Sequence, residues 1–391
     1  MKKTLWLVVI AVLLRFFLAG ITYHSDLGAF AQAGRAIAGE GKWFTFYDTM
    51  LTPKIDTVFN YQPLAYLIPS VFYLPFKSLI LETGNLVKNH DWIVANTVFF
   101  NPLLLLYKYP MILADLAFLW LLPKFFSGKK EKTLVMLLWA FNPLAIFVSS
   151  MMGQVDIIIA LFITAGLYLY QKDKPFLSML IIALSALIKP VGLILIPILA
   201  LHYFATHKKF LQSLLLAITG LGVYLLGILP YLGSTAYRYY ALFAEQIGKS
   251  TYAAISIASG HEIPLFFIVY TLILILVWKK RLSFSTAVAT ALLSTLAFSH
   301  FHPQWLVWVM PWLVVYSISK SDYFIYLTLI ISWLFILFSF DSSLHLQIFI
   351  HSTLSLPAFI SGSSYFLEII QLSRAGIIAV LIWLLVDYEK N

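Results

Sequence analysis

Cysteine is absent from the 391-residue chain, and charged residues make up only 11% of it. Without cysteine there is no disulfide framework, no thiolate nucleophile and no metal site built on thiolates. Soluble domains carry roughly 25% charged residues, so a chain that is also 61% hydrophobic is not a soluble globule. We expect a polytopic protein whose first partner is the lipid bilayer.

Acidic residues are scarcer than basic ones, with 17 Asp and Glu against 26 Lys and Arg. The basic residues form short clusters between apolar runs instead of one continuous stripe, so they indicate membrane topology and not a nucleic-acid partner. We predict a plasma-membrane protein with both termini in the cytoplasm. The predicted cytoplasmic clusters are Lys2 and Lys3, Lys124 to Lys132, Lys172 and Lys174, Lys208 and Lys209, Lys279 to Arg281, Lys320, and Lys390.

The apolar runs between these clusters are each long enough for one membrane helix of roughly 15 to 22 residues. Together they predict an all-α fold of twelve crossings in a single domain, residues 1–391. The predicted crossings are 4–20, 110–126, 133–150, 153–170, two half-helices within 176–201, 211–232, 263–278, 284–300, 305–318, 323–340 and 373–387.

Residues 176–201 need two crossings because basic clusters lie at both ends, although their length suits only one. The pair Lys189-Pro190 lies at the midpoint. Proline removes a backbone donor and disfavours helix at the preceding residue, so we expect two half-helices that meet at Lys189.

A long first outer loop is expected at residues 21–109, with further outer loops at 233–262 and 341–372. Helical periodicity at 27–38 and an apolar stretch at 64–81 predict helices that lie at the membrane interface. An alternative is that 64–81 and 92–106 form one more hairpin through the bilayer, which leaves the topology of the rest unchanged.

Strongly polar residues stand at the edges of several apolar runs, and the predicted topology brings them to the extracytoplasmic side. Ionisable groups at membrane depth are costly and are therefore functional candidates. The set comprises Asp26, Gln154, Asp156, Lys189, His300, His302 and Gln304.

Several short motifs resemble the GT-C superfamily of polytopic glycosyltransferases, most closely the enzymes that use dolichyl-phosphate mannose or glucose and their bacterial relatives. They occur in the family's order: HSDLGAFAQAGRAIAGEG, Tyr61-Gln62-Pro63-Leu64, KYPMILADL, NPLAIFVSSMMGQVD, ALIKP and FHPQWLVWVMPWL. The resemblance implies a polyprenyl-phosphate sugar donor, inversion at the sugar carbon, and chemistry served by the acid of the first outer loop. Here that loop has one acid in HSDLG instead of a pair, and Gln62 replaces a proline, so metal dependence stays open.

Sugar transfer from a lipid phosphate requires a general base, a cation for the phosphate and a dry cavity. Asp26 is the candidate general base. The alternative role for Asp26 is that of a solvated acid at the membrane interface. Lys189 is the phosphate candidate, the alternative being a structural ion pair. Asp156 either binds substrate or complements the dipole at the start of a helix.

The remaining candidates are hydrogen-bonding groups. Gln154, His300, His302 and Gln304 suit phosphate or sugar hydroxyls, and their alternative is a capped loop. The two histidines lack a third zinc ligand at the usual spacing, so no metal residue is assigned; no cofactor is firmly expected, and a divalent ion stays open.

A separate charged set lies within the apolar runs. Lys108 and Asp115 are seven residues apart and share a face if one helix carries both, and with Arg15 they suit a buried charge pair.

These features predict an inverting membrane hexosyltransferase, mannosyltransferase-like, that uses a polyprenyl-phosphate-linked sugar and a glycan, lipid or protein acceptor outside the cytoplasm. One rival is a transporter or lipid flippase without enzymatic activity, which would place its charges near the midplane. Another is a lipid-linked polysaccharide polymerase or ligase, which uses diphosphate donors.

The topology can be tested with single cysteines because the native chain has none. We expect cysteines at positions 26, 154, 189 and 302 to be labelled from outside, or from a cavity open to it. Cysteines at 130, 173, 208 and 280 should be labelled only from the cytoplasm. Outer labelling at 130 or 208 would overturn the topology.

Overall fold

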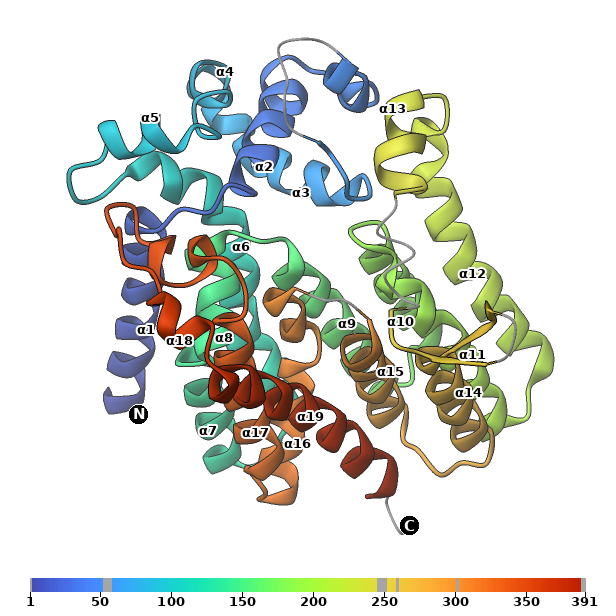
Figure 1. The fold of residues 1–391 in the computed structure, drawn as a ribbon. Helices are drawn as coiled ribbons and strands as arrows, with labels where there is room; N and C mark the ends of the chain where they lie inside the picture. The colour runs from blue at the N-terminus through green and yellow to red at the C-terminus, as the bar shows by residue number, and fades with distance from the viewer. Residues whose placement is uncertain (1, 52–57, 245–251, 258–259, 300–301, 388–391) are drawn as a thin grey trace.

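Helices make up most of the computed structural model, which describes residues 2–51, 58–244, 252–257, 260–299 and 302–387 (Figure 1). In the first half they are α1 (Lys2–Ile21), α2 (Leu27–Gly34), α3 (Leu64–Tyr73), α4 (Lys77–Thr83), α5 (His90–Ala95), α6 (Pro102–Leu121), α7 (Lys129–Ala140), α8 (Pro143–Ile146), α9 (Asp156–Gln171) and α10 (Pro175–Ala186). In the second half they are α11 (Leu195–His207), α12 (Phe210–Ile228), α13 (Thr235–Tyr237), α14 (Leu265–Trp278), α15 (Phe284–Phe298), α16 (Met310–Lys320), α17 (Phe324–Leu337), α18 (Ala358–Ser361) and α19 (Ser364–Val386).

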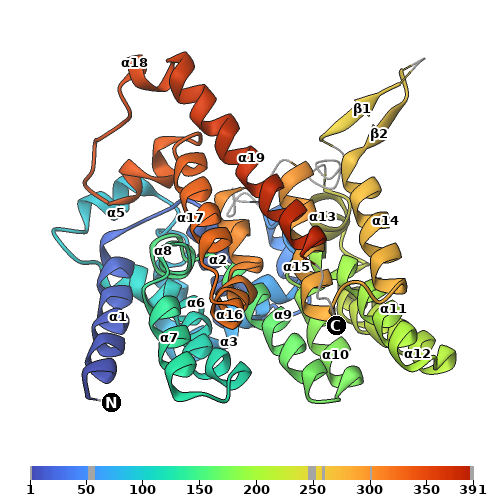
Figure 2. The same ribbon diagram turned by 90° about the horizontal axis from the view of Figure 1, so that it is seen from below.

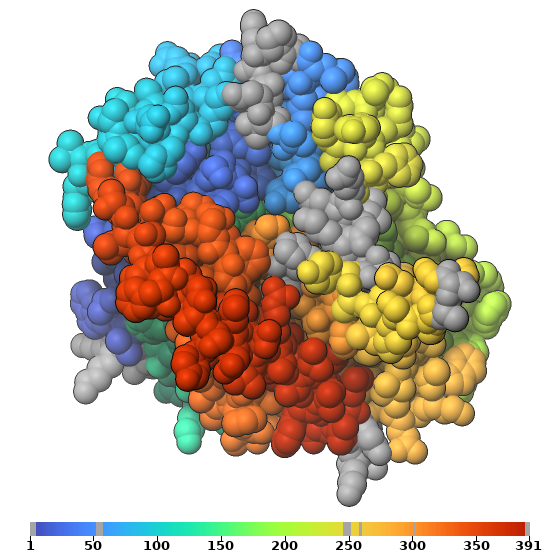
Figure 3. All heavy atoms as spheres, in the orientation of Figure 1, coloured from blue at the N-terminus to red at the C-terminus, as the bar shows by residue number. Residues whose placement is uncertain are grey.

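The helices form two groups, which both ribbon views separate. Helices α1, α6, α7 and α8 lie on one side, and α10, α11, α12 and α14 on the other, with α9 and α15 between them (Figures 1 and 2). Helix α19 packs on α15 and α17, and in the space-filling view the C-terminal segment crosses the front of the molecule (Figure 3). One large apolar core joins the two groups.

One element departs from the predicted all-α fold. Strands β1 (Ala254–Ser256) and β2 (Glu262–Pro264) form an antiparallel hairpin in the second outer loop, with Ile255 opposite Ile263. A hairpin this short gives no alternating run long enough to be read from the sequence.

Length and composition identify five described helices as able to cross a membrane: Leu64–Thr83, Pro102–Phe125, Pro190–His207, Phe210–Tyr231 and Ser364–Val386. The bent pair Lys129–Ala140 and Pro143–Met152, at 46°, makes a sixth, and several shorter apolar helices accompany them. The chain is therefore a multi-pass membrane protein, as predicted, and the count of twelve crossings stays a prediction.

Two helices begin well before the predicted crossings. Helix α6 begins at Pro102 and not at 110, because the Asn101 side chain caps it by accepting a hydrogen bond from the Leu103 N–H (2.9 Å). Helix α19 begins at Ser364 and not at 373, where the Ser363 hydroxyl accepts from the Phe366 N–H (3.2 Å). In both cases a capping side chain sets the start that hydropathy alone had placed too late.

The predicted break within 176–201 is confirmed, and the helix after it is longer than the predicted half-helix. Helix α10 ends at Ala186, and a 3₁₀ turn (η6, Pro190–Ile194) leads into α11. Lys189 lies between them in extended conformation, as expected for a residue before proline.

The first outer loop folds against the helix bundle. The predicted helix at 27–38 is present as α2, which continues into a π turn (η1, Arg35–Gly39), and 64–81 is helical as α3 and α4. The alternative of a second hairpin arm at 92–106 is not seen, because α5 stops at Ala95 and α6 starts at Pro102. A separate apolar cluster under the loop includes Leu27, Tyr73, Ile80 and Tyr107.

A buried charge network ties α1, α6 and α7 together. Arg15 Nε donates to Asp115 Oδ2 (2.7 Å), and both side chains are fully buried. Arg15 also donates to the Ala140 carbonyl (2.6 Å), while Trp139 Nε1 and the Ser149 hydroxyl donate to Asp115 (2.8 and 2.7 Å). The predicted buried pair is thus confirmed for Arg15 and Asp115, and Lys108 bonds elsewhere.

Removing one charge of this pair should destabilise the bundle. We expect Asp115→Ala to cost about 3–5 kcal/mol, because Arg15 would be left buried and uncompensated. The double variant Arg15→Met/Asp115→Leu should recover most of that loss, since it removes both charges. Thermal unfolding in detergent measures both, and a double variant as unstable as the single one would contradict this account.

Candidate active site

Asp26 lies in the short connection between α1 and α2, and its side chain is 42% exposed. It occupies the N-cap of α2, yet within the described chain no α2 N–H bonds to its carboxylate. Its Oδ2 instead accepts a hydrogen bond from Gln154 Nε2 (2.6 Å). The carboxylate is therefore available for chemistry and is not used to cap the helix.

Lys108 holds this connection in place. Its Nζ donates to the carbonyls of Ala19 and Thr22 (3.1 and 2.6 Å) and to the Thr22 hydroxyl (3.0 Å). Gly153, at φ +74°, packs against the Lys108 chain so closely that a Cβ would lie 2.6 Å from its Cγ. Glycine is thus required just before Gln154 both by its left-handed backbone and by the space.

Lys189 forms the second polar centre. Its Nζ donates to both carboxylate oxygens of Asp156 (2.8 Å each), and Trp308 Nε1 donates to Asp156 Oδ1 (2.8 Å). Asp156 is fully buried and the Lys189 side chain is 7% exposed. The Lys189 Nζ also lies 4.6 Å from the centre of the Tyr61 ring, close enough for a cation–π contact.

The two centres are joined by two segments. Gln154 bonds to Asp26, and Asp156 bonds to Lys189. The turn at residues 153–156, which leads into α9, therefore contacts both polar centres. In addition, the Gln62 and Leu64 N–H groups donate to the carbonyls of Ile188 and Leu187 (3.3 and 2.8 Å), which seats the outer loop on the half-helix junction.

Tyr61 lies where these segments meet. Burial, reinforced by the carboxylates of Asp26 and Asp156, raises the pKa of its hydroxyl well above the ordinary value. The hydroxyl therefore stays protonated and can donate a hydrogen bond, but it cannot act as a base at neutral pH.

A cavity of about 400 Å³ opens beside Asp26. Its walls include Tyr61, Asn60 and Lys88 besides Asp26. Lys88 is held there by close packing, since a Cβ on Gly28 would lie 2.7 Å from the Lys88 Cβ. Sequence reasoning missed Lys88 and Asn60, because both belong to a loop whose path depends on long-range packing.

The segment after α15 supplies further polar groups. Gln304 and Trp305 lie on a 3₁₀ turn (η11, Pro303–Trp308), and the His302 ring packs against Trp305 and Phe340, with ring centroids 5.6 and 5.7 Å apart. His300 lies outside the described residues.

Three buried polar atoms in these segments have no hydrogen-bond partner within the described part of the chain: Gln154 Oε1, Gln304 Oε1 and Trp305 Nε1. Buried polar atoms are normally satisfied, so each of these three exceptions is a candidate contact for a polar ligand. Among the described residues, no group of three or more His, Asp or Glu has the arrangement of a metal site.

The chain is similar to known proteins in part of its sequence and in its fold. Residues 97–262, which include Gln154, Asp156 and Lys189, match the model of glycosyltransferase family 87. The fold is similar to ArnT from Cupriavidus metallidurans, solved bound to undecaprenyl phosphate, with a TM-score of 0.53 and 14% identity, over 99% of this chain and 76% of that one. No curated protein sequence matches the chain. The family match supports a glycosyltransferase, and the structural match shows a fold similar to that of ArnT.

Proposed function

We propose that this protein transfers a hexose, mannose-like, from a polyprenyl phosphate to an acceptor on the extracytoplasmic side, with inversion at the sugar carbon. The observation that carries the proposal is the turn 153–156, which joins an exposed carboxylate to a buried cation. The undecaprenyl phosphate bound by ArnT, a protein of similar fold, supports a polyprenyl donor.

Asp26 is the proposed general base. Because Gln154 occupies Oδ2, Oδ1 remains for the acceptor hydroxyl, and Gln154 fixes the direction in which it points. The acceptor oxygen attacks the anomeric carbon while its proton passes to Asp26. The bond from that carbon to the phosphate oxygen breaks, and the electron pair leaves with the phosphate.

Lys189 is the proposed cation for the departing phosphate. An ammonium group has three N–H donors, and Asp156 takes two of them, so one remains for a phosphate oxygen. In this arrangement Asp156 orients Lys189, and its buried carboxylate does not itself touch the sugar. This narrows the substrate-binding role that the sequence had suggested for Asp156.

The remaining polar groups are proposed to bind the sugar. Gln304 and Trp305 carry unsatisfied atoms that match hydroxyl groups, and Asn60 and Lys88 face the cavity that contains Asp26. His302 lies beside Trp305, whose ring centre is 5.3 Å from Lys189 Nζ. The acceptor, whether glycan, lipid or protein, would enter by the cavity.

Asp26→Asn tests the base. The amide keeps the size of the side chain but cannot take a proton, so we expect turnover to fall by roughly 10² to 10⁴ with donor binding near normal. Turnover is measured with a polyprenyl-phosphate hexose as the donor. A nucleotide sugar is tested in parallel and should not act as a donor. Asp91→Asn, on the exposed α5 of the same loop, is the matched control and should be fully active. Normal turnover of the Asp26 variant would reject it as the base.

Lys189 is tested with a charge-balanced double variant. Lys189→Met alone would leave Asp156 buried and unpaired, so Lys189→Met/Asp156→Asn removes both charges and keeps an acceptor for Trp308 Nε1. We expect donor affinity to fall at least about tenfold. Lys189→Arg should retain part of the activity.

Both Lys189 variants need a thermal unfolding control in detergent. A folded double variant with wild-type donor affinity would assign the Lys189–Asp156 pair to packing alone.

A further inference from the structure

A second cavity, of about 480 Å³, lies at the other end of the helices that carry the active site. Helix α9 begins at Asp156 in the active site, and Tyr170 and Gln171 at its end line this cavity. The 16 residues of α9 span about 24 Å at the usual rise of an α-helix. The second cavity is therefore separate from the active site.

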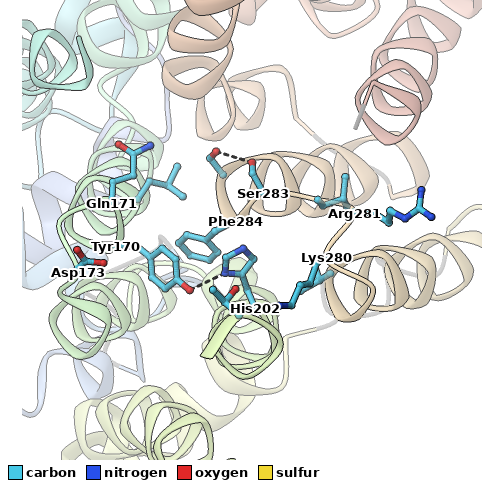
Figure 4. A pocket seen from close by; sticks show the side chains of 13 residues that line it. Tyr170, Gln171, Asp173, His202, Lys280, Arg281, Ser283 and Phe284 are labelled. Carbon is cyan, nitrogen blue, oxygen red and sulfur yellow. Dashed lines mark hydrogen bonds between the residues drawn. The ribbon is translucent and has the colours of Figure 1, made fainter. Parts of the chain in front are cut away.

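The ends of four helices form its walls: those of α9 and α11, the end of α14 and the start of α15 (Figure 4). Tyr170 and His202 face each other across it, and the Tyr170 hydroxyl lies 2.7 Å from His202 Nδ1. Within the described part of the chain nothing bonds to the second ring nitrogen of His202, which leaves one polar atom for a ligand.

The cavity wall is rich in cations. Lys280 and Arg281 line it, and Asp173 is the one carboxylate among its described lining residues. Ser285, in the first turn of α15, adds a hydroxyl at a helix end whose free N–H groups favour anions.

Lys280 has an unusual backbone for its residue type. It adopts φ +56° at the end of α14, where its N–H donates to the Val277 carbonyl (2.9 Å) and the Arg281 N–H donates to the Leu276 carbonyl (2.8 Å). This is the Schellman arrangement, in which glycine is the preferred residue at the left-handed position. A lysine at this position carries a backbone cost that a glycine would not.

We propose that this cavity binds a phosphate group, carried either by the headgroup of an anionic lipid or by free inorganic phosphate. Lys280 supplies the charge, and Ser285 and His202 supply directed hydrogen bonds. One candidate membrane span, Pro190–His207, ends beside the cavity, which puts the cavity within reach of lipid headgroups. The proposal does not depend on the sugar-transfer reaction.

The experiment compares two glycine variants of the full chain. Lys280→Gly removes the proposed phosphate ligand and at the same time relieves the backbone, so the variant should fold at least as well as the native chain. Lys208→Gly is the matched control: Lys208 is exposed like Lys280 and has the same left-handed conformation, φ +59°, at the end of α11, but it lies outside the cavity lining.

Binding is measured with the protein in nanodiscs of phosphatidylcholine containing increasing phosphatidylglycerol, and separately by titration of inorganic phosphate. We expect Lys280→Gly to weaken binding about tenfold and Lys208→Gly to leave it unchanged. Retention of phosphatidylglycerol binding by Lys280→Gly, or an equal loss in Lys208→Gly, would overturn the proposal and leave these lysines as topology signals only.

The two titrations identify the source of the phosphate. Binding in the phosphatidylglycerol series that inorganic phosphate does not displace identifies a lipid headgroup site. Displacement by inorganic phosphate, lost in Lys280→Gly alone, identifies a site for the free anion. Absence of binding in both titrations of the native protein would reject the site.

Discussion

The ion pair between Lys189 and Asp156 is the interaction on which the rest of the site depends. It lies at the break between α10 and α11, and its two side chains are almost completely buried. A single buried charge would be prohibitive there, whereas a pair with further hydrogen bonds is tolerated. Because Asp156 is bound on one side by Lys189 and on the other by Trp308, three distant segments of the chain are fixed around one carboxylate.

The helix break beside this ion pair also positions the outer loop. A helix that stops at Ala186 leaves carbonyl groups without intrahelical partners, and the loop at Gln62 and Leu64 supplies N–H groups for two of the next residues. Gln62 then bonds through its side chain to Tyr237 and to the Ala241 carbonyl (2.6 and 3.1 Å). Gln62 thus connects two loops, which a proline at this position could not do.

Much of this architecture could be predicted from local sequence, and the parts that could not have a common cause. The proline after Lys189 indicates the helix break, and the seven-residue spacing of Lys108 and Asp115 indicates one helix face; both are short-range signals. The partner of Lys189 is 33 residues away, and Tyr61, Lys88 and Trp308 reach the site only through the folded loops. No periodicity in the sequence encodes such contacts. The sequence could therefore single out Asp156 as a candidate, but not its pairing with Lys189 or the contacts made by the other residues.

Burial differs between the two proposed functional groups in a way that suits the reaction. The Asp26 carboxylate is 42% exposed and opens on a cavity, whereas the Lys189 side chain is 7% exposed and lies at a break between helices. A base must meet an acceptor that arrives from water, while a phosphate attached to a polyprenyl chain arrives from the bilayer. A cation acts more strongly on the phosphate where water is excluded, and a carboxylate is a better base where its charge is not fully neutralised by a cation. Separate environments for the two groups therefore let one site accept substrates from two phases and still bring them together at the turn 153–156.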